Sequence, residues 1–308
     1  MKICVVGTGA MGSVYAGLLA DAGNEVWALD CWADHIEAIR RKGLRVTGKS
    51  GDRRVRISAT TRAADVGPCD LVIIATKAMD VVPAAESAKP LLGQDTVVLT
   101  IQNGLGSFEK VANILGTQRV IVGIAGGFGA SIKEPGHVHH NGMEFVHLGE
   151  LSGPQTQRLE DIAAIWINAG FRVQTFDDIH QLVWEKLICN VCFSATCAIT
   201  EMTIGDVMAD ANAWAVASGC ATEAFLVARA KRIHIDFNDP VAYVRNFGAK
   251  IPRAKPSMLL DHLAGRPSEI SVINGAIPVE GAKVGLPTPF NTVVTALVRA
   301  KEKHLGLF

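Results

Sequence analysis

The chain has 308 residues, a length that allows about two domains with a sizeable core each. Its 30 basic and 30 acidic side chains cancel, which argues against nucleic acid or an anionic membrane as the main partner, because both attract an excess of positive charge. Hydrophobic residues make up 49% of the chain and charged residues 19%, which excludes a disordered protein. The seven cysteines are odd in number and scattered, so we expect free thiols in a cytoplasmic protein.

Residues 3–20 carry no charge and superficially resemble a signal peptide or a membrane span. Gly7, Gly9, Gly12 and Gly17 divide this run into a five-residue strand, a turn and a helix. We therefore interpret it as part of a folded domain and predict no membrane association.

Short β-rich runs alternate with helical stretches up to about residue 176. This alternation predicts parallel strands joined by crossover helices, and thus an α/β fold with a Rossmann-type doubly wound sheet. The expected strands are Lys2–Val6, Glu25–Asp30, Leu71–Ala75, Val97–Ile101, Val120–Ile124 and Arg172–Phe176. The expected helices are Ala10–Ala22, Ala33–Lys42, Val81–Leu92 and Phe108–Leu115.

Two stretches interrupt the alternation. Leu44–Ala59, with Gly48 and Gly51 at its centre, predicts a β-hairpin. The overlapping segment Arg40–Arg56 holds eight Lys or Arg residues and one acid, so it forms either a solvated hairpin face or a surface that attracts an anionic cofactor or substrate. Ala125–Glu150 is rich in glycine and β-prone residues and predicts an antiparallel extension of the sheet.

The β-type pattern ends at about residue 178, and the remaining chain predicts an all-α domain. We place the domain boundary between residues 1–177 and 178–308. The expected helices are Ile179–Thr200, Asp210–Ile233, Pro240–Ala249, Ile270–Val284 and Phe290–His304.

A glycine-rich turn follows the first expected strand and opens the first expected helix, which is the context of a dinucleotide-binding turn. Its three glycines would permit the tight turn, the close approach of a pyrophosphate and the packing of helix on strand. The positive end of the helix dipole would attract the pyrophosphate. The expected cofactor contacts are Gly7, Thr8, Gly9, Ala10, Met11 and Gly12.

Asp30, at the end of the second expected strand, indicates which dinucleotide binds. A carboxylate there accepts hydrogen bonds from the ribose hydroxyls and repels a 2′-phosphate, and the next residue is Cys31 rather than an arginine. We expect NAD, while NADP stays open because the basic stretch Arg40–Arg56 could lie close to Asp30.

Further segments of the chain resemble the ketopantoate reductase (2-dehydropantoate 2-reductase) family, and the resemblance runs from residue 1 to about residue 300. Those segments are Ala75-Thr76-Lys77, Gln102-Asn103-Gly104-Leu105-Gly106, Pro135-Gly136-His137-Val138-His139, Trp184-Glu185-Lys186-Leu187-Ile188-Cys189-Asn190 and Glu269-Ile270-Ser271-Val272-Ile273-Asn274-Gly275.

The resemblance implies a cofactor cleft between a dinucleotide-binding domain and a helical substrate-binding domain, with hydride transfer to the 2-oxo carbon of a small branched acid. It implies that Lys186 donates the proton and that Asn103 and Glu269 are further catalytic residues. The implied cofactor contacts beyond the turn and Asp30 are Lys77, Asn103, Ala130 and Glu269, and the implied substrate contacts are Lys186, Asn190, Ser194 and Ser257.

The chemistry of these residue types supports the implied roles. A hydride that reaches a carbonyl carbon leaves an alkoxide, which a nearby ammonium stabilises and protonates. Burial moves the pKa of a lysine toward neutrality. Lys186 and Asn190 are spaced i, i+4, so they share one face of a helix and can point at one substrate.

Two departures from the family pattern leave the substrate open. Ser194 and Ala254 stand where the family commonly has asparagine, and the loss of amide donors would pair the pantoate hydroxyl and carboxylate less well. The first alternative is an NAD-dependent dehydrogenase of the same family that acts on another branched or aromatic 2-hydroxy acid. The second is a non-catalytic nucleotide-sensing protein. A homodimer also stays open, because a dimer face and a core produce the same apolar helices.

No metal site is predicted. Cys189, Cys192 and Cys197 lie inside an apolar helical stretch, where small buried thiols are usual. His137 and His139 alternate on an expected strand, and no acid or cysteine pattern completes a site with them.

Overall fold

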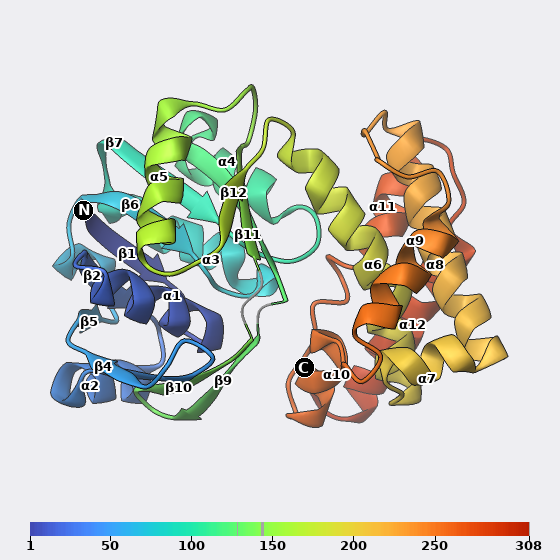
Figure 1. The fold of residues 1–308 in the computed structure, drawn as a ribbon, viewed down its shortest axis with the longest axis horizontal. Coiled ribbons are helices and arrows are strands. Elements are labelled where there is room, and N and C mark those ends of the chain that lie inside the picture. Colours follow the sequence, from blue (N-terminus) through green and yellow to red (C-terminus); the bar gives the residue numbers. More distant parts are fainter. Residues whose placement is uncertain (128, 143–144, 308) are drawn as a thin grey trace. The chain divides into compact units, whose positions relative to one another are not determined.

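The structure is a computed structural model that describes residues 1–127, 129–142 and 145–307. The chain forms two compact units. Residues 1–102 and 107–179 make up the first, and residues 103–106 with the chain from 180 onward make up the second. The first is an α/β unit and the second is helical, which confirms the predicted fold class (Figure 1).

An eight-stranded sheet runs through the described part of the first unit, and its neighbouring strands are parallel except for β11, which is antiparallel to β8. The apolar residues of its central strands are buried, as expected for a parallel sheet with covered faces. In spatial order the strands are β12 (Val173–Thr175), β11 (Phe145–Glu150), β8 (Val120–Gly126), β7 (Leu92–Thr100), β6 (Cys69–Ile74), β1 (Lys2–Val6), β2 (Glu25–Leu29) and β5 (Ser58–Thr60). The helices of the unit are α1 (Ala10–Asp21), α2 (Ala33–Lys42), α3 (Val81–Ser87), α4 (Ser107–Leu115) and α5 (Gln157–Asn168).

The strand order reverses at β1. The chain runs from β1 outward to β2 and β5, then returns to β6 on the other side of β1 and continues to β7 and β8. The carboxyl ends of β1 and β6 therefore flank the switch point of the sheet, where open α/β sheets bind their ligands.

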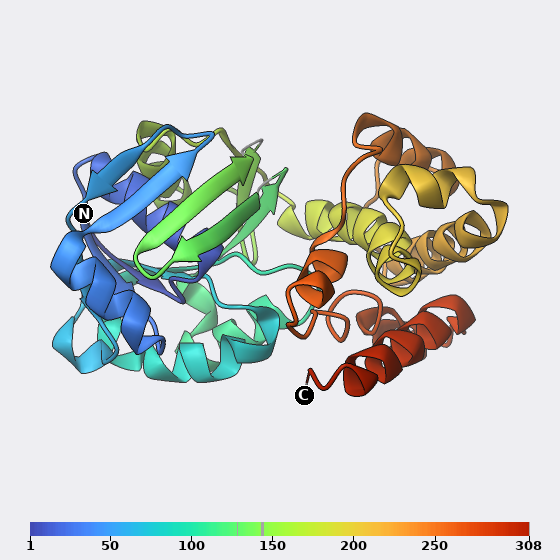
Figure 2. The same cartoon turned by 90° about the horizontal axis from the view of Figure 1, so that it is seen from below.

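A second sheet corrects the interpretation of residues 125–150. The predicted hairpin forms as β3 (Leu44–Gly48) and β4 (Arg53–Val55). Instead of extending the large sheet, β10 (His137–Gly142) pairs with β3 and β9 (Gly129–Glu134) pairs with β10, so only β11 extends the large sheet. Figure 2 shows the blue β3 and β4 beside the green β9 and β10. The register explains this choice, because it pairs the buried Val46 with the buried Val138 on the face that contacts α1.

Two predicted helices differ from the observed ones by more than three residues at one end. The helix expected over Val81–Leu92 ends at Ser87 and is followed by a 3₁₀ turn, Lys89–Leu91, because Pro90 has no N–H for a helical hydrogen bond. The segment before Ala276 is a series of turns rather than helix, so Glu269 and Asn274 are not on a helix. Tertiary contacts hold this segment, because the fully buried Asn274 amide bonds to the core.

The second unit is built around α6 (Ile179–Thr200), whose apolar residues belong to its hydrophobic core. By length and composition α6 could cross a membrane, but 67% of its apolar window is buried inside the protein, as in the core helix of a globular unit. The other helices are α7 (Ile204–Ala209), α8 (Ala211–Ala230), α9 (Pro240–Lys250), α10 (Ser257–Leu263), α11 (Ala276–Lys283) and α12 (Pro289–His304).

Candidate functional site

The glycine-rich turn lies at the switch point of the large sheet. Gly7 has a φ of 90°, and a Cβ there would lie 2.7 Å from the backbone N of Thr76. A Cβ on Gly12 would lie 2.0 Å from the carbonyl oxygen of Gly7, so the helix can pack on the strand only with glycine. Around Gly9, by contrast, no heavy atom of the described residues lies within 4 Å of a Cβ position. The turn is tight at both ends and leaves space at its middle.

The turn and the segment that packs against Gly7 carry polar groups without partners among the described residues. The buried hydroxyls of Thr8 and Thr76 make no hydrogen bond to any described residue. Helix α1 has no side-chain cap, and the first of its N–H groups with a partner is that of Ser13, which donates to Gly9 at 2.9 Å. Unpaired N–H groups and hydroxyls at a helix N-terminus are the donors that a pyrophosphate accepts. The residues present therefore fit the phosphates of a dinucleotide.

The segment after β6 contacts the turn directly. Ala75 N donates to Val6 O at 2.8 Å, and the Gln102 side-chain amide donates to the carbonyls of Ile74 (2.7 Å) and Thr76 (3.2 Å). Gln102 was not among the predicted site residues, although it directly precedes Asn103 in the sequence. Lys77 follows Thr76 at the start of the next 3₁₀ turn.

Asp30 directly follows β2 and is half-buried. One of its carboxylate oxygens accepts a hydrogen bond from Trp32 N at 2.9 Å. Ala130 lies elsewhere, on β9 of the second sheet and opposite His140.

Several arginines of the basic stretch Arg40–Arg56 bond to acidic side chains or to backbone carbonyl oxygens. Arg45 pairs with Asp52 at 2.7 Å, and Arg53 pairs with Asp21 at 2.6 Å. The Arg40 guanidinium donates to the carbonyl of Ala59 at 2.6 Å. These contacts favour the interpretation of the stretch as a paired, solvated hairpin.

In the second unit, a hydrogen-bonded chain joins three of the predicted site residues. Lys186 Nζ, on α6, lies 2.9 Å from Asn103 Oδ1, and Asn103 Nδ2 lies 3.2 Å from Glu269 Oε2. An ammonium can only donate, so Asn103 must present its oxygen to Lys186 and its NH₂ to Glu269. The structure thus brings together residues that are 83 and 166 positions apart in the sequence.

A close backbone contact holds Asn103 in place. Leu105 N donates to Val272 O at 2.9 Å, and Gly104 has a φ of 77°. A Cβ on Gly104 would lie 2.1 Å from the same Val272 oxygen. Only glycine lets the 103–106 loop sit this close to the turns that carry Glu269.

Burial lowers the pKa of Lys186 to about 8, while the negative charge of Glu269 acts in the opposite direction. At neutral pH the ammonium form predominates, yet the proton is held much less tightly than on an exposed lysine. This is the protonation behaviour that a general acid needs.

Three further predicted residues lie in the second unit outside this chain. Asn190 is half-buried and one turn along α6 from Lys186, and its side chain makes no hydrogen bond to a described residue. Ser194 follows one turn later and is buried. Ser257 is exposed at the start of α10, and no hydrogen bond between described residues links it to Lys186.

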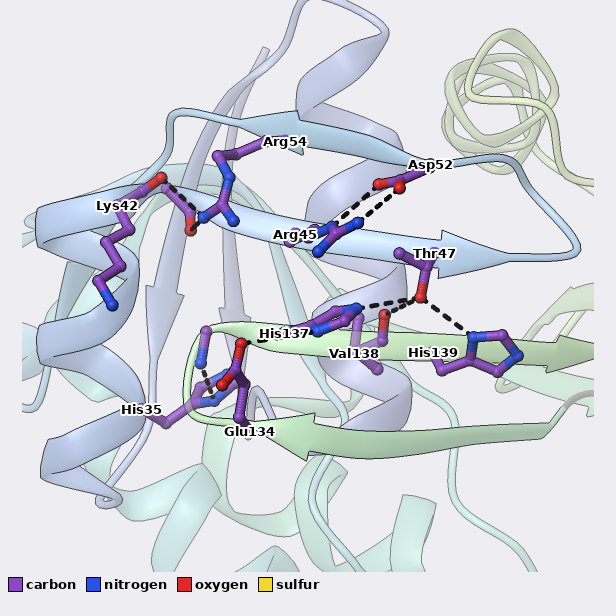
Figure 3. Close-up of polar contacts among 12 residues, drawn as sticks. His35, Lys42, Arg45, Thr47, Asp52, Arg54, Glu134, His137, Val138 and His139 are labelled. Atoms are coloured by element: carbon purple, nitrogen blue, oxygen red, sulfur yellow. Dashed lines mark hydrogen bonds and ion pairs between the residues drawn. The ribbon is translucent and has the colours of Figure 1, made fainter.

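The cysteines and histidines that were predicted not to bind a metal make packing and hydrogen-bond contacts within the fold. Burial raises the pKa values of Cys189 and Cys197 to about 12, so these thiols stay protonated. His137 and His139 lie on β10, where both rings contact the Thr47 hydroxyl (Figure 3). Within the described residues, no group of three or more His, Cys, Asp or Glu could hold a metal ion.

Comparison with known proteins gives matches over nearly the whole chain. Residues 3–153 match the family described as ketopantoate reductase PanE/ApbA, and residues 178–302 match its C-terminal domain. The chain is 33% identical to the 2-dehydropantoate 2-reductase of Pyrococcus horikoshii, with 99% of each protein covered.

Solved structures also match nearly the whole chain. The chain resembles a PanE/ApbA family ketopantoate reductase from Ralstonia eutropha with a TM-score of 0.91 and 33% identity, over 99% of this chain and 100% of the other. It also resembles D-mandelate dehydrogenase, solved with NADH and anilino(oxo)acetate, with a TM-score of 0.92 and 28% identity over 100% of both chains.

Proposed function

The chain belongs to the ketopantoate reductase family, and on that premise we propose that it reduces 2-dehydropantoate to pantoate with a nicotinamide dinucleotide, with Lys186 as proton donor. The observation that carries the proposal is the hydrogen-bonded chain from Lys186 through Asn103 to Glu269. In this proposal residues 1–177 bind the dinucleotide and residues 178–308 bind the substrate.

The dinucleotide, when bound, supplies the hydride that reaches the 2-oxo carbon. Lys186 presents an N–H to the substrate oxygen, stabilises the negative charge that develops there and transfers the proton. Asn103 holds Nζ through its amide oxygen, and Glu269 holds that amide in the required orientation. Asn190, one turn further along the same helix, offers an amide to the substrate.

We propose NAD as the cofactor. The second Asp30 carboxylate oxygen is not used by the Trp32 N–H and can accept a bond from a ribose hydroxyl. Arg40, Arg45 and Arg53 already have partners, which supports the view that the basic stretch does not supply a 2′-phosphate site. Lys77 and Ala130 are carried over as cofactor contacts from the resemblance alone.

A second candidate substrate is a larger or aromatic 2-oxo acid. Ser194 and Ala254 place small side chains where the family commonly has asparagine, and a D-mandelate dehydrogenase is among the structures that this chain resembles. Ser257 stays a proposed substrate contact in either case.

Initial rates with a panel of 2-oxo acids and both reduced nucleotides test these proposals. We expect fastest turnover with 2-dehydropantoate and NADH. Faster reduction of phenylglyoxylate or 2-oxoisovalerate would move the assignment to the second candidate, and absence of turnover with every acid would favour a nucleotide-sensing protein.

We also propose a cytoplasmic homodimer. The described cysteines are all free, which suits a reducing compartment. Phe290, Val293 and Leu297 lie along one face of α12 and are 42%, 56% and 50% exposed. A partner that covers this face would bury apolar surface that is otherwise in water. Light scattering of the purified protein, with Val293→Lys as the variant expected to be monomeric, tests the assembly.

A further inference from the structure

A chain of hydrogen bonds runs beneath the glycine-rich turn and uses residues that the sequence motif does not include. The hydroxyl of Ser13, in α1, lies 2.7 Å from the carbonyl oxygen of Thr8 and 3.1 Å from Nε2 of His35 in α2. On its other side, His35 Nδ1 accepts a hydrogen bond from Gly136 N at 3.1 Å. Thr8, Ser13 and His35 are fully buried. The chain therefore joins the dinucleotide turn to α2 and to the β9–β10 turn of the second sheet, where Figure 3 shows His35.

The direction of every bond follows from the chemistry of the groups. A backbone N–H can only donate, so Nδ1 of His35 carries no proton. The neutral imidazole then holds its proton on Nε2 and donates it to the Ser13 oxygen. With its oxygen occupied as an acceptor, the Ser13 hydroxyl directs its own proton to the Thr8 carbonyl. Burial, which lowers the pKa of His35 against the opposing charge of Asp30, is consistent with this neutral form.

The last bond orients a donor of the cofactor site. In a planar trans peptide the carbonyl of one residue and the N–H of the next point in opposite directions. Fixing Thr8 O toward Ser13 therefore fixes Gly9 N–H on the opposite side of the peptide. This N–H has no partner among the described residues, and the space beside Gly9 holds no heavy atom of theirs within 4 Å.

Trp32 packs against the His35 end of this hydrogen-bonded chain. Its ring stacks on the imidazole of His35 with centroids 4.9 Å apart and planes 16° from parallel. Its backbone N–H donates to Asp30 at 2.9 Å. Trp32 thus links Asp30, the residue expected to bind the ribose, to His35 in the hydrogen-bonded chain beneath the glycine-rich turn.

We propose that His35, as its Nε2–H tautomer, is a positioning residue for the dinucleotide, because it holds the Ser13 hydroxyl on Thr8 O and so directs Gly9 N–H at the pyrophosphate. This inference rests on the proposed function only in requiring that the protein binds a nicotinamide dinucleotide. The orientation of the Thr8–Gly9 peptide is then set by residues of α2 and the second sheet as well as by the glycines of the turn.

Two substitutions of His35 separate the two ends of the chain. Glutamine carries its amide at the level of Nε2, so His35→Gln keeps a donor for Ser13 and loses the acceptor for Gly136. Asparagine carries its amide at the level of Nδ1, so His35→Asn keeps the acceptor and loses the donor. Ser13→Ala removes the hydroxyl itself. The control is Ser50→Ala, which also removes a serine–histidine contact, a part-buried one of 3.0 Å to His140, elsewhere in the unit.

The measurement is the dissociation constant of NADH, obtained by fluorescence titration without substrate, together with the thermal unfolding midpoint of each variant. We expect His35→Gln and Ser50→Ala to bind within about twofold of the unsubstituted protein. We expect His35→Asn and Ser13→Ala to bind about tenfold more weakly, as for one lost hydrogen bond, and their combination to be no weaker than either alone.

Equal weakening by His35→Gln and His35→Asn would overturn the proposal, as would lowered midpoints with unchanged NADH binding, since either would show a merely structural role. An unsubstituted protein that binds neither NADH nor NADPH would overturn the proposed function as well. If it binds NADH and all variants bind equally, only the inference on His35 fails.

Discussion

Replacement of Lys186 by glutamine separates proton donation from the structural part of the Lys186–Asn103–Glu269 chain. Glutamine can still donate a hydrogen bond toward Asn103 Oδ1, which lies 2.9 Å from Nζ, but it cannot transfer a proton to an alkoxide. General acid catalysis contributes about 10² to 10⁴ in rate, so we expect kcat for 2-oxo acid reduction to fall by about 10²-fold or more. Titration with NADH should give an unchanged dissociation constant, because Lys186 does not form part of the dinucleotide turn.

The pH dependence of kcat/KM provides a second, independent test of the role of Lys186. Because burial lowers the pKa of Lys186 to about 8, kcat/KM for reduction should decline as pH rises through about 8, where the ammonium loses its proton. The oxidation of the hydroxy acid should show the opposite trend. In Lys186→Gln this transition near pH 8 should disappear.

The lowered pKa of Lys186 also predicts that the Lys186→Gln variant is more stable than the unsubstituted protein at pH 7. The fall from 10.5 to about 8 corresponds to about 3 kcal/mol against the charged form in the folded state. Between pH 8 and 10.5 the unfolded chain binds more protons, so the stability of the unsubstituted protein rises with pH in that window. Lys186→Gln should therefore raise the free energy of unfolding at pH 7 by up to about 3 kcal/mol, and this advantage should vanish above pH 10.5.

Steady-state rates from pH 6 to 10 and denaturant unfolding at pH 7 and 11 check these expectations. The assignment of Lys186 as the acid is refuted if Lys186→Gln turns over substrate at half the original rate or faster. A glutamine variant that is less stable than the parent at pH 7 and 11 alike would refute the argument from burial.

Three other substitutions test the remaining parts of the site. Asp30→Arg should replace ribose recognition by a phosphate contact and move the ratio of kcat/KM for NADPH over NADH upward by about tenfold or more, and an unchanged ratio would contradict the role of Asp30. Gly12→Ala would place a methyl group 2.0 Å from the Gly7 oxygen, so NADH binding measured by fluorescence should be lost, and normal binding would show that the turn does not hold the cofactor. Asn274→Ala leaves the carbonyl of Val191 and the amide oxygen of Asn291 without their donor, so urea unfolding should show a loss of about 2 to 5 kcal/mol, whereas a loss below 1 kcal/mol would mean that this buried pairing contributes little.

The sequence by itself determined the elements whose signals are local. The strand Lys2–Val6, the helix Ala33–Lys42 and the helix Ile179–Thr200 have the predicted bounds, because side-chain periodicity, glycine and proline act within a few residues. The same holds for the spacing of Lys186 and Asn190, since four residues make one helical turn.

Non-local pairing explains where the prediction failed. The β-prone residues over 125–150 predicted strands, but local composition cannot tell which sheet edge a strand will join. Strand β10 pairs with the hairpin strand β3, and β9 pairs with β10. The turns that carry Glu269 were expected to be helical, because the chain after about residue 178 has a helix-like pattern. The amide of Asn274 is bonded to the core instead, and this contact is invisible in the sequence.

The tertiary structure alone decided which distant side chains meet. The resemblance named Asn103, Lys186 and Glu269, but their contacts depend on the 103–106 loop, which packs against Val272 O through a glycine with positive φ. Likewise, His35 became a candidate only when α2, α1 and the β9–β10 turn placed Ser13 and Gly136 on its two nitrogens. Local patterns set backbone conformation over short distances, whereas the protonation, burial and direction of a functional group depend on neighbours that only packing supplies.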